Sequence, residues 1–151
     1  MSIRRIFSGA ICIGLLLPLG ACSSHTGIRA LETQSTPTDV LPTGVELDDT
    51  VDAESSRLLT THKQVRYFAA ASHDSSVGCI IVVPPGTDPQ WFAGCGGMGA
   101  ADLIVTASTM PSNMSASLVR DNADTRTLES QGWTRIHENI LIPSVQGETV
   151  R

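Results

Sequence analysis

Cys79 and Cys95 are the residues whose type and spacing best suit covalent chemistry. They lie on two apolar segments joined by the turn-forming run from Pro84 to Pro89. A hairpin of this kind brings two thiols together, so the spacing favours a structural disulfide. A redox-active or metal-binding thiol pair is the alternative. The chain has no Cys-x-x-Cys motif and no histidine motif that would complete a zinc site, so the sequence predicts no metal and no cofactor.

A third cysteine, Cys22, ends an apolar leader. Arg4 and Arg5 precede the apolar run 6–18, and small residues follow it up to the cysteine. This is the three-part pattern of an export signal. The apolar stretch is short for a membrane-spanning helix, which needs about 20 residues.

The run Leu19-Gly20-Ala21-Cys22 resembles the lipobox of bacterial lipoproteins. The resemblance implies that residues 1–21 are a cleaved signal peptide and that the Cys22 thiol carries a diacylglyceryl group. The mature protein is then expected on the extracytoplasmic side of the cell membrane, anchored in its lipid by two acyl chains. The alternative is an ordinary signal peptide, with Cys22 an incidental thiol.

The glycine run from Gly94 to Gly99 satisfies the pattern G-x-G-x-x-G. In a dinucleotide-binding unit these glycines open a helix that holds a pyrophosphate. Here the strand-like Leu103-Ile104-Val105 follows instead. We therefore expect a mobile turn after the second cysteine strand.

The histidines and methionines do not form a recognised catalytic or metal motif. His62 is expected at a helix end, His73 before a turn and His137 in the last strand. A copper(I) site could use Met98, Met110 and Met114, but methionines without clustered His or Cys more often fill gaps in a core. Nucleophile-elbow, His-Glu-x-x-His and Ser-x-x-Lys motifs are all missing, so the sequence leans against an enzyme.

Charge is distributed unevenly along the chain. Between Glu32 and Glu54 there are acids and no base, whereas acids and bases nearly balance from residue 55 onward. No basic patch is present, which argues against a nucleic-acid partner. The segment 22–51 is also rich in Ser, Thr and Pro. Because such a composition buries little apolar surface, we expect it to be a flexible tether spanning on the order of 30 Å.

The remaining sequence predicts one small domain over 52–143, followed by a flexible tail over 144–151. Asp52 is expected to cap a short helix over 53–61, and Asp121 or Asn122 to cap a second over 123–131, ended by Gly132. Strands are expected between and after the helices, over 65–72, 77–83, 91–95, 103–108, 115–120 and 133–142. Their close spacing favours hairpins, so the predicted fold is α+β, a small antiparallel sheet with one or two short helices and one disulfide.

Over roughly residues 54–142 the chain resembles small envelope lipoproteins of high-GC Gram-positive bacteria. The resemblance depends on the Ser55-Ser56-Arg57-Leu58-Leu59 start, the Tyr67-Phe68 strand, the cysteine hairpin and the Gly132-Trp133 ending. It implies the compartment and the disulfide but no activity. The expected role is a non-enzymatic module that binds an envelope protein or wall polymer. The alternatives are an envelope hydrolase or transferase with a non-sequential site, and a redox or metal sensor using Cys79 and Cys95.

Overall fold

The computed structural model describes residues 27–87, 90–110 and 113–144. The predicted signal peptide, the lipidation site Cys22 and nearly all of the predicted tail lie outside this part. The strands are β1 (Val51–His62), β2 (Val65–Ser72), β3 (Val77–Val83), β4 (Phe92–Gly97), β5 (Leu103–Thr109), β6 (Met114–Val119), β7 (Trp133–His137) and β8 (Ile140–Pro143). The helices are α1 (Arg126–Ser130) and two short 3₁₀ turns, η1 (Arg29–Glu32) and η2 (Pro37–Asp39). No helix among the described residues is long and apolar enough to cross a membrane.

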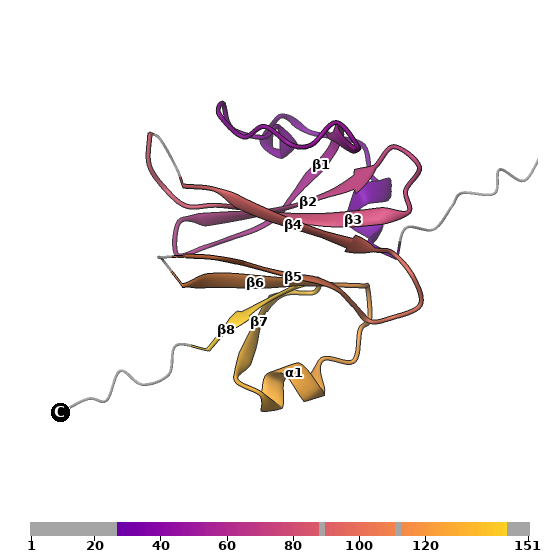
Figure 1. Cartoon of the computed structure of the whole chain (residues 1–151), viewed down its shortest axis with the longest axis vertical. Coiled ribbons are helices and arrows are strands. Elements are labelled where there is room, and N and C mark those ends of the chain that lie inside the picture. Colours follow the sequence, from indigo (N-terminus) through magenta and orange to yellow (C-terminus); the bar gives the residue numbers. More distant parts are fainter. Residues whose placement is uncertain (1–26, 88–89, 111–112, 145–151) are drawn as a thin grey trace, which may run out of the picture.

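The strands form two antiparallel four-stranded sheets rather than one (Figure 1). Sheet A has the order β1-β2-β3-β4, and sheet B the order β5-β6-β8-β7. The described structure is therefore richer in β-structure than the predicted α+β fold. The predicted strands 65–72 and 77–83 are confirmed as β2 and β3. The predicted strand 133–142 is divided into β7 and β8 by a turn at residues 138–139.

The helix predicted over 53–61 is wrong, because these residues belong to edge strand β1. A large bulge interrupts the pairing of β1 with β2 between Asp52 and Arg57. Within it, the Ser55 hydroxyl replaces backbone groups, accepting the Ala71 N–H at 2.8 Å and lying 3.2 Å from the Ala71 carbonyl. Asp52 accepts the Glu54 N–H at 3.0 Å. Asp52 therefore accepts a nearby backbone N–H, as a helix cap does, but the hydrogen bond lies within a bulge and no helix starts there.

The helix predicted over 123–131 is confirmed as the shorter α1. Neither Asp121 nor Asn122 starts it, since Thr125 stands at its N-cap. Gly132 ends it with φ +91°, a left-handed conformation that suits glycine.

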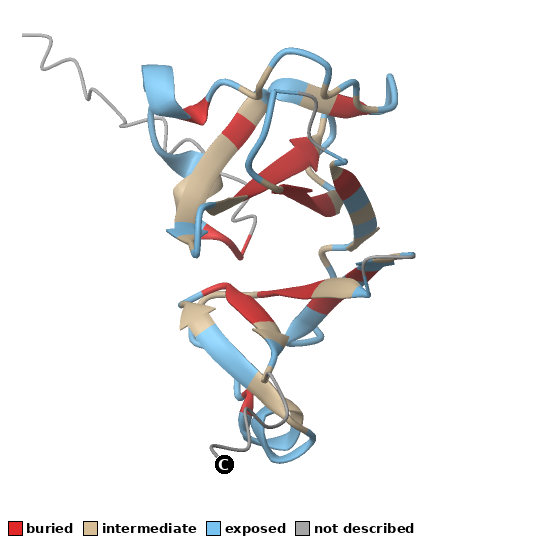
Figure 2. Cartoon of the chain, turned by 90° about the vertical axis from the view of Figure 1, so that its left-hand side faces the viewer, coloured by how far each residue is buried: buried red, intermediate tan, exposed pale blue. Residues whose placement is uncertain are grey.

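The main core lies between the two sheets (Figure 2). Its fully or nearly buried side chains are Ile28, Tyr67, Ala69, Ile80, Val82, Phe92, Ile104, Ala107, Ala116, Leu118 and Ile140. Two smaller clusters cover the outer faces. Phe68, Ile81 and Val83 are buried on the outside of sheet A, and Leu141 packs with Val119 and Ala123 on the outside of sheet B. β2 and β3 are buried on both faces, and their successive side chains pack alternately into the main core and into the outer layer of sheet A.

The glycines of the G-x-G-x-x-G motif bring β4 close to β5, where the two sheets meet. A Cβ on Gly96 would lie 2.1 Å from the Ile104 carbonyl oxygen, and one on Gly94 would lie 2.8 Å from the Ala107 Cβ. The turn expected over this run begins later than predicted, because Gly94, Gly96 and Gly97 belong to strand β4 and only Met98 and Gly99 lie beyond it. The missing side chains permit a close backbone approach. The element that follows the motif is strand β5 and not a helix, so the motif lacks the structure that a dinucleotide site requires.

The N-terminal segment closes the opposite side of the sandwich. Ile28, at the start of η1, is fully buried in the core between the sheets. Farther along, Leu41, Val45 and Leu47 pack on the outer face of sheet A. The flexible tether predicted over 22–51 therefore does not hold for residues 27–50, which form part of the folded body. These few apolar residues, spaced among polar ones, thus cover part of the main core and part of the outer layer of sheet A.

Asp39 fastens this segment to β1. Its carboxylate accepts hydrogen bonds from the Leu58 N–H at 2.8 Å and from the Thr36 N–H at 2.8 Å and hydroxyl at 2.7 Å. Its carbonyl accepts the Ser56 hydroxyl at 2.6 Å. Arg57 donates to the Thr33 carbonyl through Nε at 3.1 Å and through its terminal nitrogen at 2.6 Å.

The antiparallel topology gives the molecule two ends. The Gly27 end consists of Gly27, the turn 73–76, the loop 98–102 and the turns 120–122 and 138–139. The Asn113 end consists of the turn 63–64, residues 84–87, Asn113 and Ser144. In Figure 1 the loop from β4 to β5 lies at the right, and β5 runs from it toward the left.

Candidate functional site

A pocket at the Gly27 end is lined by several ionisable and polar side chains. It is lined by Arg29, Ala30, Thr33, Asp121, His137, Glu138 and Asn139, with a volume of about 270 Å³. The η1 turn supplies one wall, and the turn between β7 and β8 supplies the other. We call it the His137 pocket.

Asp121 organises this pocket. Its carboxylate accepts the Arg29 backbone N–H at 2.8 Å and the Asn139 side-chain N–H at 2.9 Å. Burial raises the pKa of Asp121, but these hydrogen bonds outweigh burial and hold the pKa below its ordinary value. The Asn139 amide also donates to the Val119 carbonyl at 3.1 Å. The β7–β8 turn is therefore fixed to the preceding loop and to η1.

Arg29 supplies the guanidinium that pairs with the two carboxylates of this pocket. Its guanidinium lies 3.1 Å from the Glu138 carboxylate and 3.8 Å from that of Asp121. The Arg29 side chain is 66% exposed. Ion pairs this open to water contribute little to stability, so the guanidinium can exchange its partners for a ligand.

His137 lines this pocket and accepts a hydrogen bond within its own turn. Its Nδ1 accepts the Asn139 backbone N–H at 3.1 Å, which assigns the proton of the neutral ring to Nε2. Burial lowers the pKa of His137, although the charges of Glu138 and Asp121 oppose the shift. The ring is therefore neutral at neutral pH, and its second nitrogen offers an N–H rather than a lone pair.

The arrangement suits binding better than acid–base catalysis. A general base needs a free lone pair near the proton it removes, and the Nδ1 lone pair of His137 is already occupied. Thr33 is the hydroxyl residue that lines this pocket, and its Oγ1 donates to the Ala30 carbonyl at 2.7 Å. Among the described residues, this pocket thus lacks an activated nucleophile.

A second depression, the Tyr67 groove, lies at the Asn113 end. It is lined by Tyr67, Asn113, Met114, Ser115, Ile142, Pro143 and Ser144, with a volume of about 280 Å³. None of these side chains is charged at neutral pH. Burial raises the pKa of Tyr67, which keeps its phenol neutral. The groove therefore suits an uncharged ligand or a peptide segment more than an ionic one.

The predicted disulfide between Cys79 and Cys95 is present. The two residues lie directly opposite each other on β3 and β4 with Cα atoms 4.0 Å apart. Cys79 is fully buried under the outer layer of sheet A, whereas Cys95 is exposed on the edge strand. Among the described residues, no group of three or more His, Cys, Asp or Glu is arranged to hold a metal ion.

The other predicted candidates do not join a common site. His62 ends strand β1 rather than a helix, and His73, expected just before a turn, is the first residue of the turn that leads to β3. Met98 and Met114 pack against the main core, while Met110 is 78% exposed. The three methionines therefore do not form a shared ligand set.

Sequence reasoning missed Asp39, Asp121 and Asn139 as organising residues. A signal existed for Asp39, because Thr36 and Asp39 have the spacing of a capping box, and both of its hydrogen bonds are present in η2. Asp121 and Asn139 are distant in sequence and meet only through the register of β6 with β8.

Comparisons with protein-family models, with curated proteins and with solved structures found no match. The functional argument therefore depends on the residues themselves.

Proposed function

We propose that this protein is a lipid-anchored envelope protein whose domain is a non-enzymatic binding module. The observation that carries the anchoring is Leu19-Gly20-Ala21-Cys22 at the end of an apolar leader. The disulfide supports the same compartment, because such bonds persist outside the cytoplasm.

The binding role is supported by the two surface depressions. The His137 pocket presents donors and carboxylates without an activated nucleophile, and the Tyr67 groove presents apolar and neutral polar atoms. Of the two, the Tyr67 groove is the better candidate for an envelope protein or wall polymer, since it is free of internal ion pairs. A hydrolase or transferase is the weaker alternative because His137 uses its Nδ1 lone pair within its own turn.

The anchor is tested by Cys22→Ser. The variant should lose incorporation of labelled fatty acid and should leave the detergent phase when membranes are partitioned. Cys12→Ser is the matched control, since Cys12 lies within the leader and should leave both properties unchanged. A Cys22→Ser protein that still carries label and partitions into detergent would exclude this anchor.

The binding surface is tested by a photocrosslinking residue at Ser144, in the Tyr67 groove, and by one at the exposed Ser130 of α1 as a control. Irradiation of intact cells should give a crosslinked species from position 144 and none from position 130. Equal products from both positions, or none from position 144, would count against the groove.

A further inference from the structure

We propose that the protein holds its Gly27 end against the lipid headgroup layer of the bilayer and directs its Asn113 end away from it. This inference rests on the proposed lipidation of Cys22. It follows from where the chain is fixed to the folded body, at Gly27 and Ile28, and from how little sequence separates that point from Cys22.

The chain is fixed to the folded body at Gly27. The Gly27 carbonyl accepts the Asp121 N–H at 2.8 Å, and the next residue, Ile28, is fully buried. The Arg120 guanidinium packs so closely on Gly27 that a Cβ there would lie 2.5 Å from its Nε. Gly27 also has φ +76°, a backbone conformation that residues other than glycine rarely adopt. These contacts prevent the chain from peeling away at this point without opening the core.

Only residues 23–26 lie between Cys22 and Gly27. Even when fully extended, a chain of this length spans at most about 18 Å from one α-carbon to the other. A free coil over 22–51 would instead span on the order of 30 Å and would place no limit on which side faces the membrane. The packing of residues 27–50 thus replaces a long, non-directional tether by a short one attached at one end of the domain.

The surface that meets the headgroups consists of loops rather than strand edges. The loop 98–102 exposes Gly99, Ala100 and Ala101, and Leu103 beside it is 39% exposed. The Arg120 guanidinium donates to the Gly99 carbonyl at 2.5 Å and so ties this loop to the Gly27 exit. These small and apolar side chains present little bulk to a polar interface.

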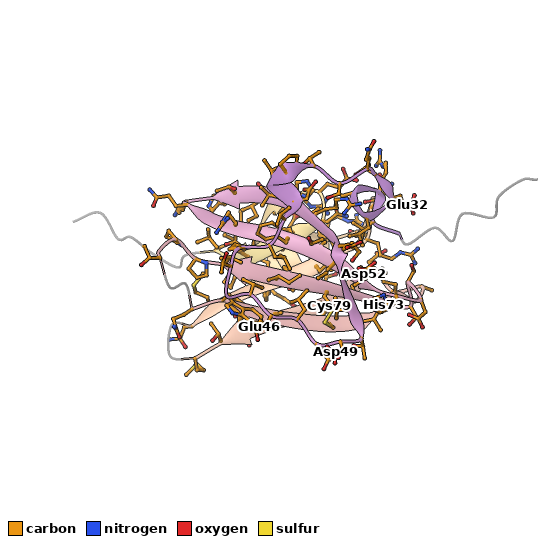
Figure 3. All side chains as sticks on the ribbon, turned by 90° about the horizontal axis from the view of Figure 1, so that it is seen from above. Glu32, Glu46, Asp49, Asp52, His73 and Cys79 are labelled. Atoms are coloured by element: carbon orange, nitrogen blue, oxygen red, sulfur yellow. A yellow bond between two sulfur atoms is a disulfide. The ribbon has the colours of Figure 1, made fainter. Side chains whose placement is uncertain are left out.

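Charge does not supply the attraction. At this end the acids Asp74, Asp102, Asp121 and Glu138 outnumber the bases Arg29 and Arg120. Figure 3 shows Asp52 and His73 toward the same end, with Glu46 farther along the molecule. Anionic lipid would therefore repel this surface, but the repulsion decays over about 8 Å at physiological ionic strength. The covalent tether, not ionic adhesion, sets the orientation.

The Asn113 end then stands clear of the membrane. Strand β5 runs from Leu103 near the Gly27 exit to Thr109 at the other end, a length of roughly 20 Å. The Tyr67 groove lies at this outer end and is presented to the envelope space, where a wall polymer or soluble partner can reach it.

The test uses the full lipidated protein in phosphatidylcholine vesicles that contain a headgroup-spin-labelled lipid. A fluorophore is attached to Ala101→Cys at the Gly27 end or, as the matched control, to Met110→Cys at the Asn113 end. Both positions are exposed. We expect strong quenching at position 101 and little at position 110. Inserting twenty Gly/Ser residues after Ser23 should bring the two positions close to equal.

Each other outcome contradicts a defined part of the proposal. Equal quenching at both positions without the insertion, or the same asymmetry with it, would overturn the orientation while the lipid anchor stands. Protein that does not associate with the vesicles, with the same behaviour in Cys22→Ser, would overturn the proposed anchor and the orientation with it.

Discussion

Asp39 fastens a long irregular segment to the sheet with one carboxylate. The residue is 7% exposed and accepts hydrogen bonds from Thr36 and Leu58. Burial raises the pKa of Asp39, but the hydrogen bonds and the nearby Arg57 charge outweigh it, so the pKa is lowered from the ordinary 3.8. A carboxyl whose pKa is lower in the folded state contributes stability above its unfolded pKa. That contribution is lost as the pH falls through the folded value.

We therefore expect Asp39→Asn to lower the free energy of unfolding at pH 7 by about 1–3 kcal/mol. The difference from the wild type should shrink as the pH falls below the ordinary pKa of 3.8, and it should be lost once the pH has passed the lower pKa of the folded carboxyl. Urea unfolding at pH 7 and at a series of pH values below 3.8 measures this. Asp49→Asn, at an exposed position of the same segment, should change little. Equal effects of the two variants would show that Asp39 has no special role.

His137 should behave as a neutral donor in solution. We expect nitrogen chemical shifts to identify the Nε2–H tautomer, because Nδ1 accepts the Asn139 N–H. The titration midpoint should lie below 6.5, since burial lowers the pKa of this ring. Since the folded ring resists protonation, acidification below pH 6.5 should also destabilise the fold. A ring protonated on Nδ1, or a midpoint above 6.5, would remove the basis for describing this pocket as a donor site.

At the scale of elements, the contact between β4 and β5 depends on missing side chains. We expect Gly96→Ala to lower the free energy of unfolding by about 1–3 kcal/mol or more, because its Cβ would lie 2.1 Å from the Ile104 carbonyl oxygen. Gly97→Ala is the matched control, since a Cβ there meets nothing within 4 Å. Thermal unfolding of the two variants compares them directly. Similar melting temperatures for the two variants would mean that β4 and β5 can move apart at Gly96 without loss of stability.

The elements with strong local signals were predictable. β2 and β3 combine apolar runs with clear turns, and the disulfide follows from the hairpin geometry of β3 and β4. The segment over 53–61 could not be assigned from local signals, because its pairing with β2 through a bulge overrides a plausible helix cap. The role of the glycine run depends on an approach to Ile104, which comes from the other sheet. The His137 pocket likewise joins residues from η1, the loop after β6 and the β7–β8 turn.

At the scale of the whole molecule, the N-terminal segment packs on the sandwich and, under the proposed lipid anchoring, also limits the distance between the domain and the membrane. Composition predicted a spacer because Ser, Thr, Pro and Asp dominate this stretch. Four apolar side chains, Ile28, Leu41, Val45 and Leu47, contradict that interpretation by packing on the core or its outer layer. Full burial of one such side chain contributes about 1.5–3 kcal/mol, a large share of the stability of a small domain. Ile28 is fully buried, whereas Leu41, Val45 and Leu47 are partly buried and contribute less each.

The measurement that tests this most directly is urea unfolding of the chain 27–151 against the chain 52–151. The first retains the packed segment, and the second is the domain expected from composition alone. We predict a cooperative transition for 27–151 and a loss of most or all of its stability for 52–151, because the core loses Ile28 and sheet A loses its outer cover. Equal unfolding midpoints for the two chains would show that residues 27–51 are a spacer after all, and would contradict the account.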